Sequence, residues 1–410
     1  MSGATNDPIV AAKRMDIARA AAAQYGYPAL SLRTIAVTGT NGKTTTVNIL
    51  RALLDLPAVP AASIGTLGVL FGMEGRPIQG GLGLTTPGPD ELQRVLRQLV
   101  DAGVQSVAME VSSHALDQHR IYGIAFDAAV FTNFTRDHLD YHGTMEEYFA
   151  AKARLVGYIK GSGAAVVNAD QREWDALPVA PRLLTYGLNN GDVRADDISF
   201  DATGSNWTLR SGDESEQVRL PLVGDFNVIN SLAAVAAALA VGIPLRALAH
   251  SLAIIPQIPG RLELIAHSPP IIRDYAHTPD ALVRSLAAIR PFVTGKIILV
   301  FGAGGDRDPG KRPLMGAAAE AGADRVIVTS DNPRTEDPEA IIDEIERGMQ
   351  SPHERLSDRR RAIARAIEIA SPGDTILLAG KGHETYQVVG TEKRPFDERQ
   401  VVAELLGSAS

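Results

Sequence analysis

The stretch Thr38-Gly39-Thr40-Asn41-Gly42-Lys43-Thr44-Thr45-Thr46 decides the fold of the first part of this chain. The apolar run 34–37 before it is typical of a short buried strand, and residues 47–54 after it have the apolar spacing of a helix. A strand, a glycine loop and a helix in that order predict a phosphate-binding loop, although Gly39 and Gly42 are closer together than in the general pattern. Glycines let several backbone N–H groups point at one anion, and the helix N-terminus adds partial positive charge.

Two side chains of this loop add specific chemistry. Lys43 can reach the outer phosphates of a nucleotide, and Thr44 offers a hydroxyl to Mg2+. A glycine turn with a surface lysine is the alternative, but strand, loop and helix together favour a site for ATP and Mg2+. The loop residues that we expect to contact ATP are Gly39, Thr40, Asn41, Gly42, Lys43, Thr44 and Thr45.

Composition limits the class of protein. The 410 residues are enough for two or three domains, and 45% hydrophobic with 21% charged residues indicates a globular chain. A net charge of −8 argues against a general nucleic-acid binder, and the lack of cysteine excludes disulfides, thiolate metal sites and cysteine nucleophiles. The start of the chain has no apolar signal core, and the uncharged stretch 226–245 is alanine-rich with several polar residues, which favours a buried helix over a membrane span. We therefore expect a soluble cytoplasmic protein that binds neither nucleic acid nor membrane.

Strands and helices alternate through most of the chain. Strand-like runs at 106–111, 128–132 and 164–168, with a helix over 89–102 and another from about Met145, predict a parallel sheet covered on both faces. A polar, glycine-dotted segment, 183–222, predicts a small antiparallel sheet. We expect a lead with a linker helix (17–25) in residues 1–30, and a central ATP-binding domain of the P-loop type in residues 31–256.

The second half repeats the α/β alternation after the proline- and glycine-rich segment 257–261. Strands at 296–301, 325–329 and 375–379 each end in a polar loop, and ligands of open α/β sheets bind at that edge. We therefore predict a Rossmann-like α/β domain over residues 257–410.

Several side chains are candidates for chemistry. Glu110, at the end of a strand in the same sheet as the glycine loop, is a plausible Mg2+ ligand or a solvated acid. The cluster Asp137, His138, Asp140 and His142 could hold a metal or form a charged surface loop, and Lys152 by default is a solvated helical lysine.

The loops of the second domain carry charges of both signs. Arginine pairs bidentately with carboxylates, so Arg307 and Arg334 together with Glu384 suit a small zwitterion, with surface charge as the alternative. The residues alone therefore predict an ATP- and Mg2+-dependent enzyme with two α/β domains and an amino-acid-like ligand between them.

The chain resembles the Mur ligase family over nearly all of residues 16–405. The strings that carry the resemblance are TGTNGKTTT, TTPGP, MEVSSHALDQHR, FTNFTRDHLDYHG, EEYFAAKARL, GDFNVINSLAA, PGRLE, DYAHTPD, FGAGGDRDPGKRPLM, DNPRTEDP and GKGHETYQ. The family forms amide bonds: ATP phosphorylates an acceptor carboxylate, and an amine attacks the acyl phosphate. The likeness is strongest to the branch that adds the third residue to the UDP-N-acetylmuramoyl peptide of bacterial cell walls.

The resemblance also implies roles for individual residues. The resemblance implies catalytic roles for Lys43, Glu110, His138 and Lys152. It implies that Mg2+ is held by Thr44, Glu110, His138 and a carbamylated Lys152. It adds Asn227, Arg261 and Asp274 to the ATP site and Thr85, Thr86, Ser112, Gln118 and Arg120 to the acceptor site. The amino-acid pocket that it implies consists of Arg307, Asp331, Asn332, Pro333, Arg334, Gly380 and Glu384, and the DNPR string resembles the form that selects meso-diaminopimelate.

One departure leaves the acceptor open. The family normally carries an N-terminal domain that grips the uridine nucleotide, whereas the glycine loop here begins at residue 38. We therefore expect weaker nucleotide binding, a separate chain that supplies those contacts, or a different acceptor. Such an acceptor is a smaller muramyl-peptide-like molecule or an unrelated γ-glutamyl carboxylate, the latter in a specialised biosynthetic amide ligase. Folylpolyglutamate synthetases share the architecture, and a nucleotide-binding subunit without turnover is the non-enzymatic alternative.

Overall fold

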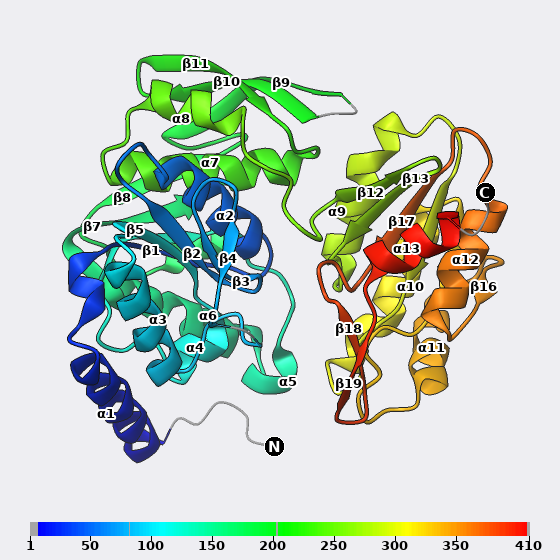
Figure 1. Ribbon diagram of the computed structural model, residues 1–410, viewed down its shortest axis with the longest axis horizontal. Helices are drawn as coiled ribbons and strands as arrows, with labels where there is room; N and C mark the ends of the chain where they lie inside the picture. Colours follow the sequence, from blue (N-terminus) through cyan, green and yellow to red (C-terminus); the bar gives the residue numbers. More distant parts are fainter. Residues whose placement is uncertain (1–6, 82, 202–203, 408–410) are drawn as a thin grey trace. The chain divides into compact units, whose positions relative to one another are not determined.

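The computed structural model describes residues 7–81, 83–201 and 204–407 (Figure 1). Internal contacts divide the chain into two compact units, unit 1 up to Pro256 and unit 2 from Gln257. Each unit is built around one large, mostly parallel sheet with helices packed on it, which confirms the predicted α/β fold class.

Unit 1 has an 11-stranded sheet in the order β11-β10-β9-β8-β7-β6-β1-β5-β2-β3-β4. Strand β1, Arg33–Thr38, lies between β5 and β6 and pairs with both in parallel. Residues 35–37 of β1 are fully buried, as expected for a central strand whose two faces are both covered. The other strands are β2 Ala61–Gly65, β3 Gly68–Phe71, β4 Arg76–Ile78, β5 Ser106–Glu110, β6 Phe126–Phe131, β7 Ile159–Asn168, β8 Leu183–Gly187, β9 Val193–Asp201, β10 Gly204–Ser211 and β11 Glu214–Leu220.

Helices cover both faces of this sheet. On one face, Leu92, Leu96 and Leu99 of α3 join a core cluster with Ala36 and Phe131 of the strands. Helix α2 packs against α7 as well as against β2 and β5. The helices of unit 1 are α1 Pro8–Gln24, α2 Lys43–Leu54, α3 Pro89–Asp101, α4 Ser113–Asp117, α5 Leu139–His142, α6 Met145–Ala153, α7 Asp225–Ala240 and α8 Leu245–Leu252.

Two sequence-based expectations for unit 1 are wrong in detail. Strands β9 to β11 do not form a separate small sheet, because β8 pairs in parallel with β7 and with β9 and so joins them to the main sheet. The helix expected over 17–25 begins at Pro8, since Asp7 caps it by accepting the N–H of Ile9 at 2.8 Å. Proline fits the first turn of a helix, where its missing N–H has no intrahelical partner to lose.

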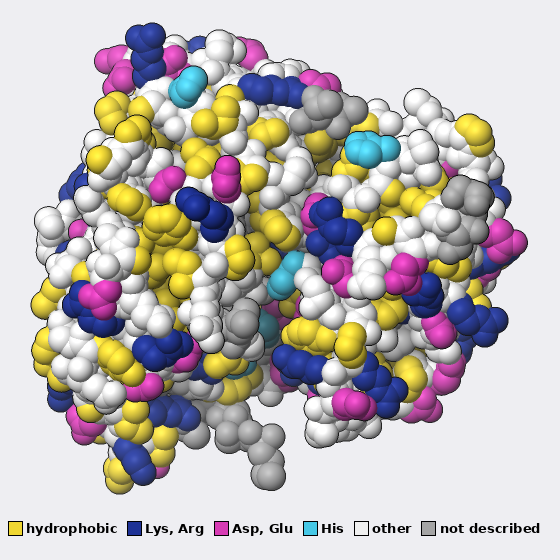
Figure 2. All heavy atoms as spheres, viewed as in Figure 1, with side chains coloured by type: hydrophobic (Ala, Val, Ile, Leu, Met, Phe, Trp, Pro, Cys, Tyr) yellow, Lys and Arg dark blue, Asp and Glu magenta, His cyan; other side chains and the backbone are white. Residues whose placement is uncertain are grey.

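The uncharged stretch of α7 is a buried helix of unit 1, with residues 232–238 fully enclosed. Within the described ranges, no helix combines the length and the apolar character that a membrane crossing requires. Figure 2 shows basic and acidic side chains interspersed over the face in view, unlike the clustered basic surface of many nucleic-acid-binding domains.

Unit 2 has a 6-stranded sheet in the order β12-β13-β17-β14-β15-β16, parallel except for the pair β12 and β13. Alternate residues of β14 point to opposite faces of the sheet. Leu299 and Phe301 pack in one core cluster with α9, α10 and α11. Ile298 and Val300 pack in a second core cluster with α12 and α13. The strands are β12 Glu263–His267, β13 Pro270–Asp274, β14 Ile297–Phe301, β15 Arg325–Val328, β16 Glu354–Arg355 and β17 Thr375–Ala379, with a separate hairpin of β18 Tyr386–Val389 and β19 Glu392–Pro395. The helices are α9 Pro279–Ile289, α10 Arg312–Gly322, α11 Pro338–Glu346, α12 Arg359–Ile369 and α13 Glu398–Gly407.

The strands predicted from 296–301, 325–329 and 375–379 correspond to β14, β15 and β17. They lie in the order β17-β14-β15 and run parallel, so their carboxyl ends and the loops that follow meet at one edge of the sheet. We therefore expect the ligand site of unit 2 at that edge.

Candidate active site

The glycine loop leaves the carboxyl end of β1 and enters α2 directly. Gly39 has a φ of 146° and Gly42 a φ of 84°. A Cβ at Gly39 would collide with Thr132 Oγ1, and one at Gly42 with Asn230 Oδ1. Only glycine fits these positions, so bare backbone can curl around an anion at the amino end of α2.

Residues at and after the carboxyl end of β6 brace this loop. Asn133 accepts the N–H of Asn41 through Oδ1 and the N–H of Thr40 through its carbonyl, both at 2.8 Å. Thr132 donates its hydroxyl to the carbonyl of Asn41 at 2.7 Å, and the hydroxyl of Tyr148 lies 3.2 Å from Thr40 Oγ1. Sequence analysis names none of Thr132, Asn133 and Tyr148 as site residues, although Asn133 belongs to the string FTNFTRDH.

Two lysines converge on one carbonyl of the loop. Lys43 Nζ donates to the carbonyls of Gly39 and Thr40 at 2.9 and 2.7 Å, and Lys152 Nζ donates to Gly39 at 2.7 Å. Lys152 is 1% exposed, so the expectation of a solvated helical lysine is wrong. Burial lowers the pKa of Lys152 well below its ordinary value, the charge of Lys43 lowers it further, and Asp137 acts in the opposite direction.

Glu110 ends β5, next to the start of the loop, and its side chain is buried. Its carboxylate accepts the N–H of Thr66 at 2.8 Å and the hydroxyl of Thr66 at 3.0 Å, one on each oxygen. Gly65 makes room for this carboxylate, because a Cβ there would collide with Glu110 Oε1. Each oxygen keeps a further lone pair for a cation. Thr66 is a supporting residue that the sequence analysis missed, with no signal of its own beyond its place after a strand.

The cluster Asp137, His138, Asp140 and His142 does not gather as a set of metal ligands in the described structure, although His138 and His142 both pack against His114. His138 Nε2 lies 3.5 Å from Asp137 Oδ2, whereas His142 Nε2 lies 2.9 Å from the hydroxyl of Ser113. Burial lowers the pKa of His138 to about 3, against the attraction of Asp137, so the imidazole is neutral and able to act as a ligand. Within the described part of the chain, no three His, Asp or Glu side chains gather closely enough to hold a metal ion by themselves. A metal here therefore needs further donors such as a threonine hydroxyl, a modified lysine or phosphate oxygens.

The five residues expected at the acceptor form one hydrogen-bonded group beside Glu110. Thr86 Oγ1 donates to the carbonyl of Glu110 at 2.9 Å and accepts the N–H of Ser112 at 3.0 Å. Arg120 donates to the carbonyl of Thr86 at 2.8 Å and to Gln118 Oε1 at 2.6 Å. The hydroxyl of the fifth, Thr85, lies 3.3 Å from the hydroxyl of Thr66, which links this group to the residue that orients Glu110.

The loops of unit 2 bring two arginines together at the edge formed by β14 and β15. A Cβ at Gly304 would meet both Arg334 Nη1, at 2.9 Å, and Arg307 Cγ, at 3.8 Å. Arg334 donates to the carbonyl of Gly305 at 2.7 Å. Burial and the charge of Arg307 lower the pKa of Arg334, whereas the carboxylates of Asp331 and Glu384 act in the opposite direction.

A second group in the same edge carries the opposite charge. Asn332 Nδ2 donates to Glu384 Oε2 at 2.8 Å, and Lys381 Nζ lies 3.1 Å from the same oxygen and 3.2 Å from Asn332 Oδ1. Asp331 Oδ1 is 3.8 Å from Lys381 Nζ, and a Cβ at Gly380 would lie 2.6 Å from Asp331 Oδ2. Lys381 is fully buried and is not among the site residues predicted from the sequence; its position between two glycines after a strand is the signal that could identify it.

The remaining expected residues divide between the units. In unit 1, Asn227 is buried at the start of α7 and donates to the carbonyl of Val223 at 2.8 Å. In unit 2, Asp274 accepts the N–H of Leu262 at 2.7 Å, and the guanidinium of Arg261 lies 4.6 Å from the ring centre of Tyr275. Burial raises the pKa of Asp274, against the effects of Arg261 and several donors. Pro333 lies in the loop between Asn332 and Arg334.

Comparison with known proteins gives the same answer for both units. The chain matches the Mur ligase middle domain over residues 37–238 and the Mur ligase glutamate ligase domain over residues 260–382. It is 48% identical over 392 residues to the UDP-N-acetylmuramoyl-L-alanyl-D-glutamate--2,6-diaminopimelate ligase of Synechococcus elongatus, covering 93% of this chain and 78% of that protein. The protein of the same name from Xanthomonas campestris is 46% identical over 394 residues, with 93% and 79% covered.

Solved structures agree with these sequence relatives. A ligase of the same name matches with a TM-score of 0.65 and 38% identity, over 96% of this chain and 83% of that one. Folylpolyglutamate synthase of Mycobacterium tuberculosis, solved with ADP and AMPPCP, matches with a TM-score of 0.75 over 89% and 92% of the two chains, and at 20% identity it shares the fold alone. Both domains of one family are present, and almost half of the residues agree with its members over more than nine-tenths of this chain. The resemblance seen in the sequence is confirmed, and the chain belongs to the Mur ligase family, whose members are ligases that form C–N bonds.

Proposed function

We propose that this protein is an ATP-dependent ligase that joins meso-diaminopimelate to the D-glutamyl carboxylate of UDP-N-acetylmuramoyl-L-alanyl-D-glutamate, in the synthesis of peptidoglycan precursors. Relatives that are 45–48% identical carry this reaction in their names. The observation that carries the proposal is the pair of arginines beside Glu384 in unit 2, because it offers both charges that an amino-acid substrate needs.

The arginine pair also accounts for the choice of amino acid. The distal end of diaminopimelate is itself a zwitterion, so its carboxylate pairs with Arg334 and its ammonium with Glu384. Lysine has the same chain length but presents only an ammonium there, opposite Arg334 and Arg307. A site built around a bidentate charge pair rejects an analogue that lacks the matching group by a large factor.

The glycine loop supports ATP as the second substrate. Its glycines have positive φ and lie so close to Thr132 and Asn230 that a Cβ would not fit, and Lys43 already lies against the loop carbonyls, within reach of bound phosphates. Asn227 Oδ1 is buried and has no hydrogen-bond partner within the described chain, which suits an acceptor for the amino group of adenine. Asp274 and Arg261 supply the further nucleotide contacts that the family resemblance implies.

The reaction divides into two transfers. The γ-phosphoryl group of ATP passes to an oxygen of the acceptor carboxylate, and ADP is the leaving group. The amine nitrogen of diaminopimelate then attacks the acyl carbon, the bond to the phosphate oxygen breaks, and the amine loses a proton to solvent. Thr86, Ser112 and Arg120 orient the acceptor, while Lys43 balances the charge that develops on the phosphates.

Mg2+ fits the residues present. Thr44, Glu110 and neutral His138 offer oxygen and nitrogen donors, and Glu110 is already oriented by Thr66. The bound ion supplies charge neutralisation for phosphoryl transfer. Lys152 joins this set as a carbamate: its lowered pKa makes the neutral amine available, the nitrogen bonds to the carbon of CO2, and one proton leaves to solvent.

The test is phosphate release with purified enzyme, ATP, Mg2+ and the UDP-linked acceptor. We expect turnover with meso-diaminopimelate. With lysine we expect a kcat/KM that is lower than the value for meso-diaminopimelate by about a hundredfold or more. An enzyme that releases no phosphate with any amino acid would be a silent nucleotide-binding subunit, and equal use of lysine would remove the selectivity argument. The same assay with an acceptor that lacks the UDP group decides whether the nucleotide is recognised; the comparisons give no support to a separate chain for that purpose, and we propose none.

A second arm addresses the modified lysine. Lys152→Ala removes the carbamate, and we expect loss of turnover with partial rescue by a short-chain carboxylate that can occupy the vacated space. Undiminished activity of Lys152→Ala would count against the carbamate while leaving the assignment of substrates intact.

A further inference from the structure

We propose that the buried ion pair between Arg359 and Glu398 positions the two loops of the amino-acid pocket in unit 2, and that it thereby sets the affinity for the amino acid. This inference rests on the proposed function and deepens it, because it assigns positioning residues that touch no substrate. Neither residue has a role that the sequence predicts, since Arg359 is distant in sequence from the loops that it contacts and Glu398 is distant from Arg359.

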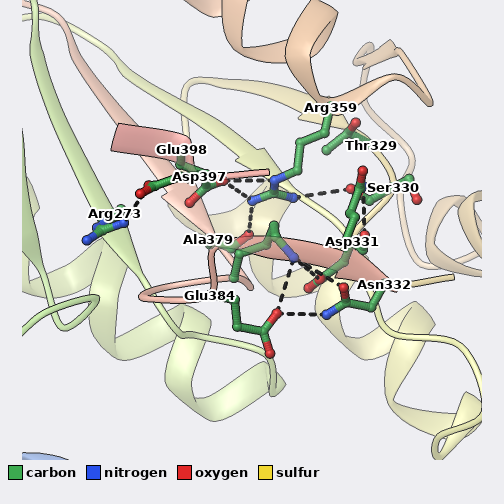
Figure 3. Close-up of polar contacts among 12 residues, drawn as sticks. Arg273, Thr329, Ser330, Asp331, Asn332, Arg359, Ala379, Glu384, Asp397 and Glu398 are labelled. Atoms are coloured by element: carbon green, nitrogen blue, oxygen red, sulfur yellow. Dashed lines mark hydrogen bonds and ion pairs between the residues drawn. The ribbon is translucent and has the colours of Figure 1, made fainter. Parts of the chain in front are cut away.

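Figure 3 draws the pair together with the residues that Arg359 contacts, Ala379 and Ser330, and with Asn332 and Glu384 of the pocket. Arg359 is the first residue of α12 and Glu398 the first residue of α13, and both side chains are fully buried. Nε and Nη2 of Arg359 contact Oε1 of Glu398 at 2.8 and 2.7 Å. One carboxylate oxygen of Glu398 therefore holds this edge of the guanidinium, through a hydrogen bond from Nε and an ion-pair contact with Nη2.

The fixed guanidinium reaches two backbone carbonyls. Nη2 donates to the carbonyl of Ala379 at 2.8 Å, and Nη1 lies 3.4 Å from the carbonyl of Ser330. Ala379 is the residue before Gly380, and Ser330 is the residue before Asp331. One side chain is thus bonded to the two points at which the pocket loops leave the sheet.

The sheet itself does not join these two points. Ala379 ends β17 and Ser330 follows β15, and these strands are not neighbours, because β14 lies between them. The hydrogen bonds between strands therefore fix β15 and β17 to β14. The distance between the two loops that follow these strands depends on further contacts beyond the carboxyl ends of the strands. Arg359 supplies such a contact across the end of β14.

The pocket depends closely on that spacing. The hydrogen bond of 2.8 Å from Asn332 to Glu384 joins one loop to the other, and Lys381 reaches both residues. The loops approach so closely that a Cβ at Gly380 would lie 2.6 Å from Asp331 Oδ2. A displacement of about 1 Å between the loops would break these contacts, since charge-assisted hydrogen bonds tolerate little lengthening.

A contribution to folding stability does not by itself explain the ion pair between Arg359 and Glu398. A buried ion pair loses its hydration on folding, and apolar residues of similar volume often replace one without loss of stability. Within the described chain, Glu398 Oε2 is buried without a hydrogen-bond partner, so the desolvation of the carboxylate is incompletely compensated. What apolar residues could not provide is the pair of directed bonds to Ala379 and Ser330.

The test separates positioning from folding with two variants and a control. Arg359→Met/Glu398→Leu removes both charges together, and Arg359→Lys keeps the charge but loses the planar fork. The control is Arg290→Met, because Arg290 also bonds a carboxylate, Asp324 at 2.7 Å, and a carbonyl, Gly322 at 2.9 Å, but at the amino end of the same sheet. Steady-state kinetics give KM for meso-diaminopimelate and for ATP, and calorimetry gives the melting temperature.

In the double variant we expect KM for meso-diaminopimelate to rise about tenfold or more while KM for ATP changes by less than about twofold. Arg359→Lys should give an intermediate rise, and Arg290→Met should leave both constants unchanged. A folded double variant with an unchanged KM for meso-diaminopimelate would overturn the proposal. If the double variant does not fold, Arg359→Lys decides by the same criterion.

Amide hydrogen exchange tests the role of the ion pair without a measurement of turnover. The amide of Val388 donates to Asn332 Oδ1 at 2.9 Å, and the amide of Arg334 donates to the carbonyl of Val388 at 3.0 Å. Both should exchange about tenfold faster in a folded variant that lacks the ion pair. If the unmodified enzyme releases no phosphate, the proposed function fails while exchange still tests the ion pair, and unchanged exchange would refute it.

Discussion

Replacing Gly39 by alanine tests whether the glycine loop needs the shape seen in unit 1. Gly39 has a φ of 146°, in the region that side chains avoid, and an added Cβ would collide with Thr132 Oγ1. Thr132 cannot simply rotate away, because its hydroxyl donates to the carbonyl of Asn41 at 2.7 Å and lies 3.2 Å from that of Thr38. Gly39→Ala therefore has to move the loop or break these bonds.

The structure gives the size of the effect. A side chain held in a sparsely populated backbone region costs about 1–3 kcal/mol, and losing the one hydrogen bond that the Thr132 hydroxyl can donate costs about 0.5–1.5 kcal/mol. We expect Gly39→Ala to destabilise unit 1 by about 1.5–4.5 kcal/mol. Because the carbonyl of Gly39 also accepts Lys43 and Lys152, the displaced loop should raise KM for ATP by about tenfold or more.

The steric part of this cost can be isolated with a double-mutant cycle. Thr132→Ala removes the colliding hydroxyl, so Gly39→Ala/Thr132→Ala should be more stable than the two single changes predict, by about 1–2 kcal/mol. The chain's two tryptophans, Trp174 and Trp207, both lie in unit 1, so their fluorescence during urea unfolding reports on that unit. Additivity within about 0.5 kcal/mol would refute the collision argument.

Three further predictions concern unit 2. Arg334→Ala should raise KM for diaminopimelate by the equivalent of about 2–3 kcal/mol, as for a lost charge-assisted pair, and an unchanged constant in steady-state assays would remove Arg334 from the pocket. Lys381→Met should lower the melting temperature and raise the same KM, because Glu384 and Asn332 lose a buried donor; a variant with normal values of both would show that the lysine is dispensable. A hydrogen bond from Arg312 lowers the pKa of Glu336, so the stability that this carboxylate contributes is present above its unfolded pKa and is lost as pH falls through the lower folded value. Calorimetry should therefore find Glu336→Gln less stable than the parent near neutral pH but equally stable in acid, and a deficit that does not change with pH would contradict this.

The sequence was most informative where a site is built from consecutive residues. The glycine loop, the strand before it and the helix after it are contiguous, so local spacing predicts their arrangement without any long-range contact. The unit 2 loops were predicted by the same logic, since Arg334 and Glu384 each follow the end of a parallel strand and such ends share one edge.

Long-range packing explains what the sequence could not reveal. Lys152 bonds Gly39, which is 113 positions away, and nothing in the composition of its helix indicates complete burial. Arg359 lies in a run of three arginines that resembles a solvated charge cluster, yet it pairs with Glu398 in the interior, 39 positions away. Strands β9 to β11 have the alternation of a free-standing antiparallel sheet, and the pairing of β8 with both β7 and β9 joins them to the main sheet.

The two units hold their loops in chemically different ways, and the difference follows from the ligands. A phosphate-binding loop has to present donors, so its brace in unit 1 uses neutral groups, Asn133, Thr132 and Tyr148, and leaves the cationic charge of Lys43 for the ligand. An amino-acid pocket has to present both charges, and bare carboxylates that line it would repel one another when buried. The counter-charges of Lys381 and Arg359 therefore belong in the scaffold of unit 2, which is why weakening that scaffold should affect the amino-acid constant far more than the ATP constant.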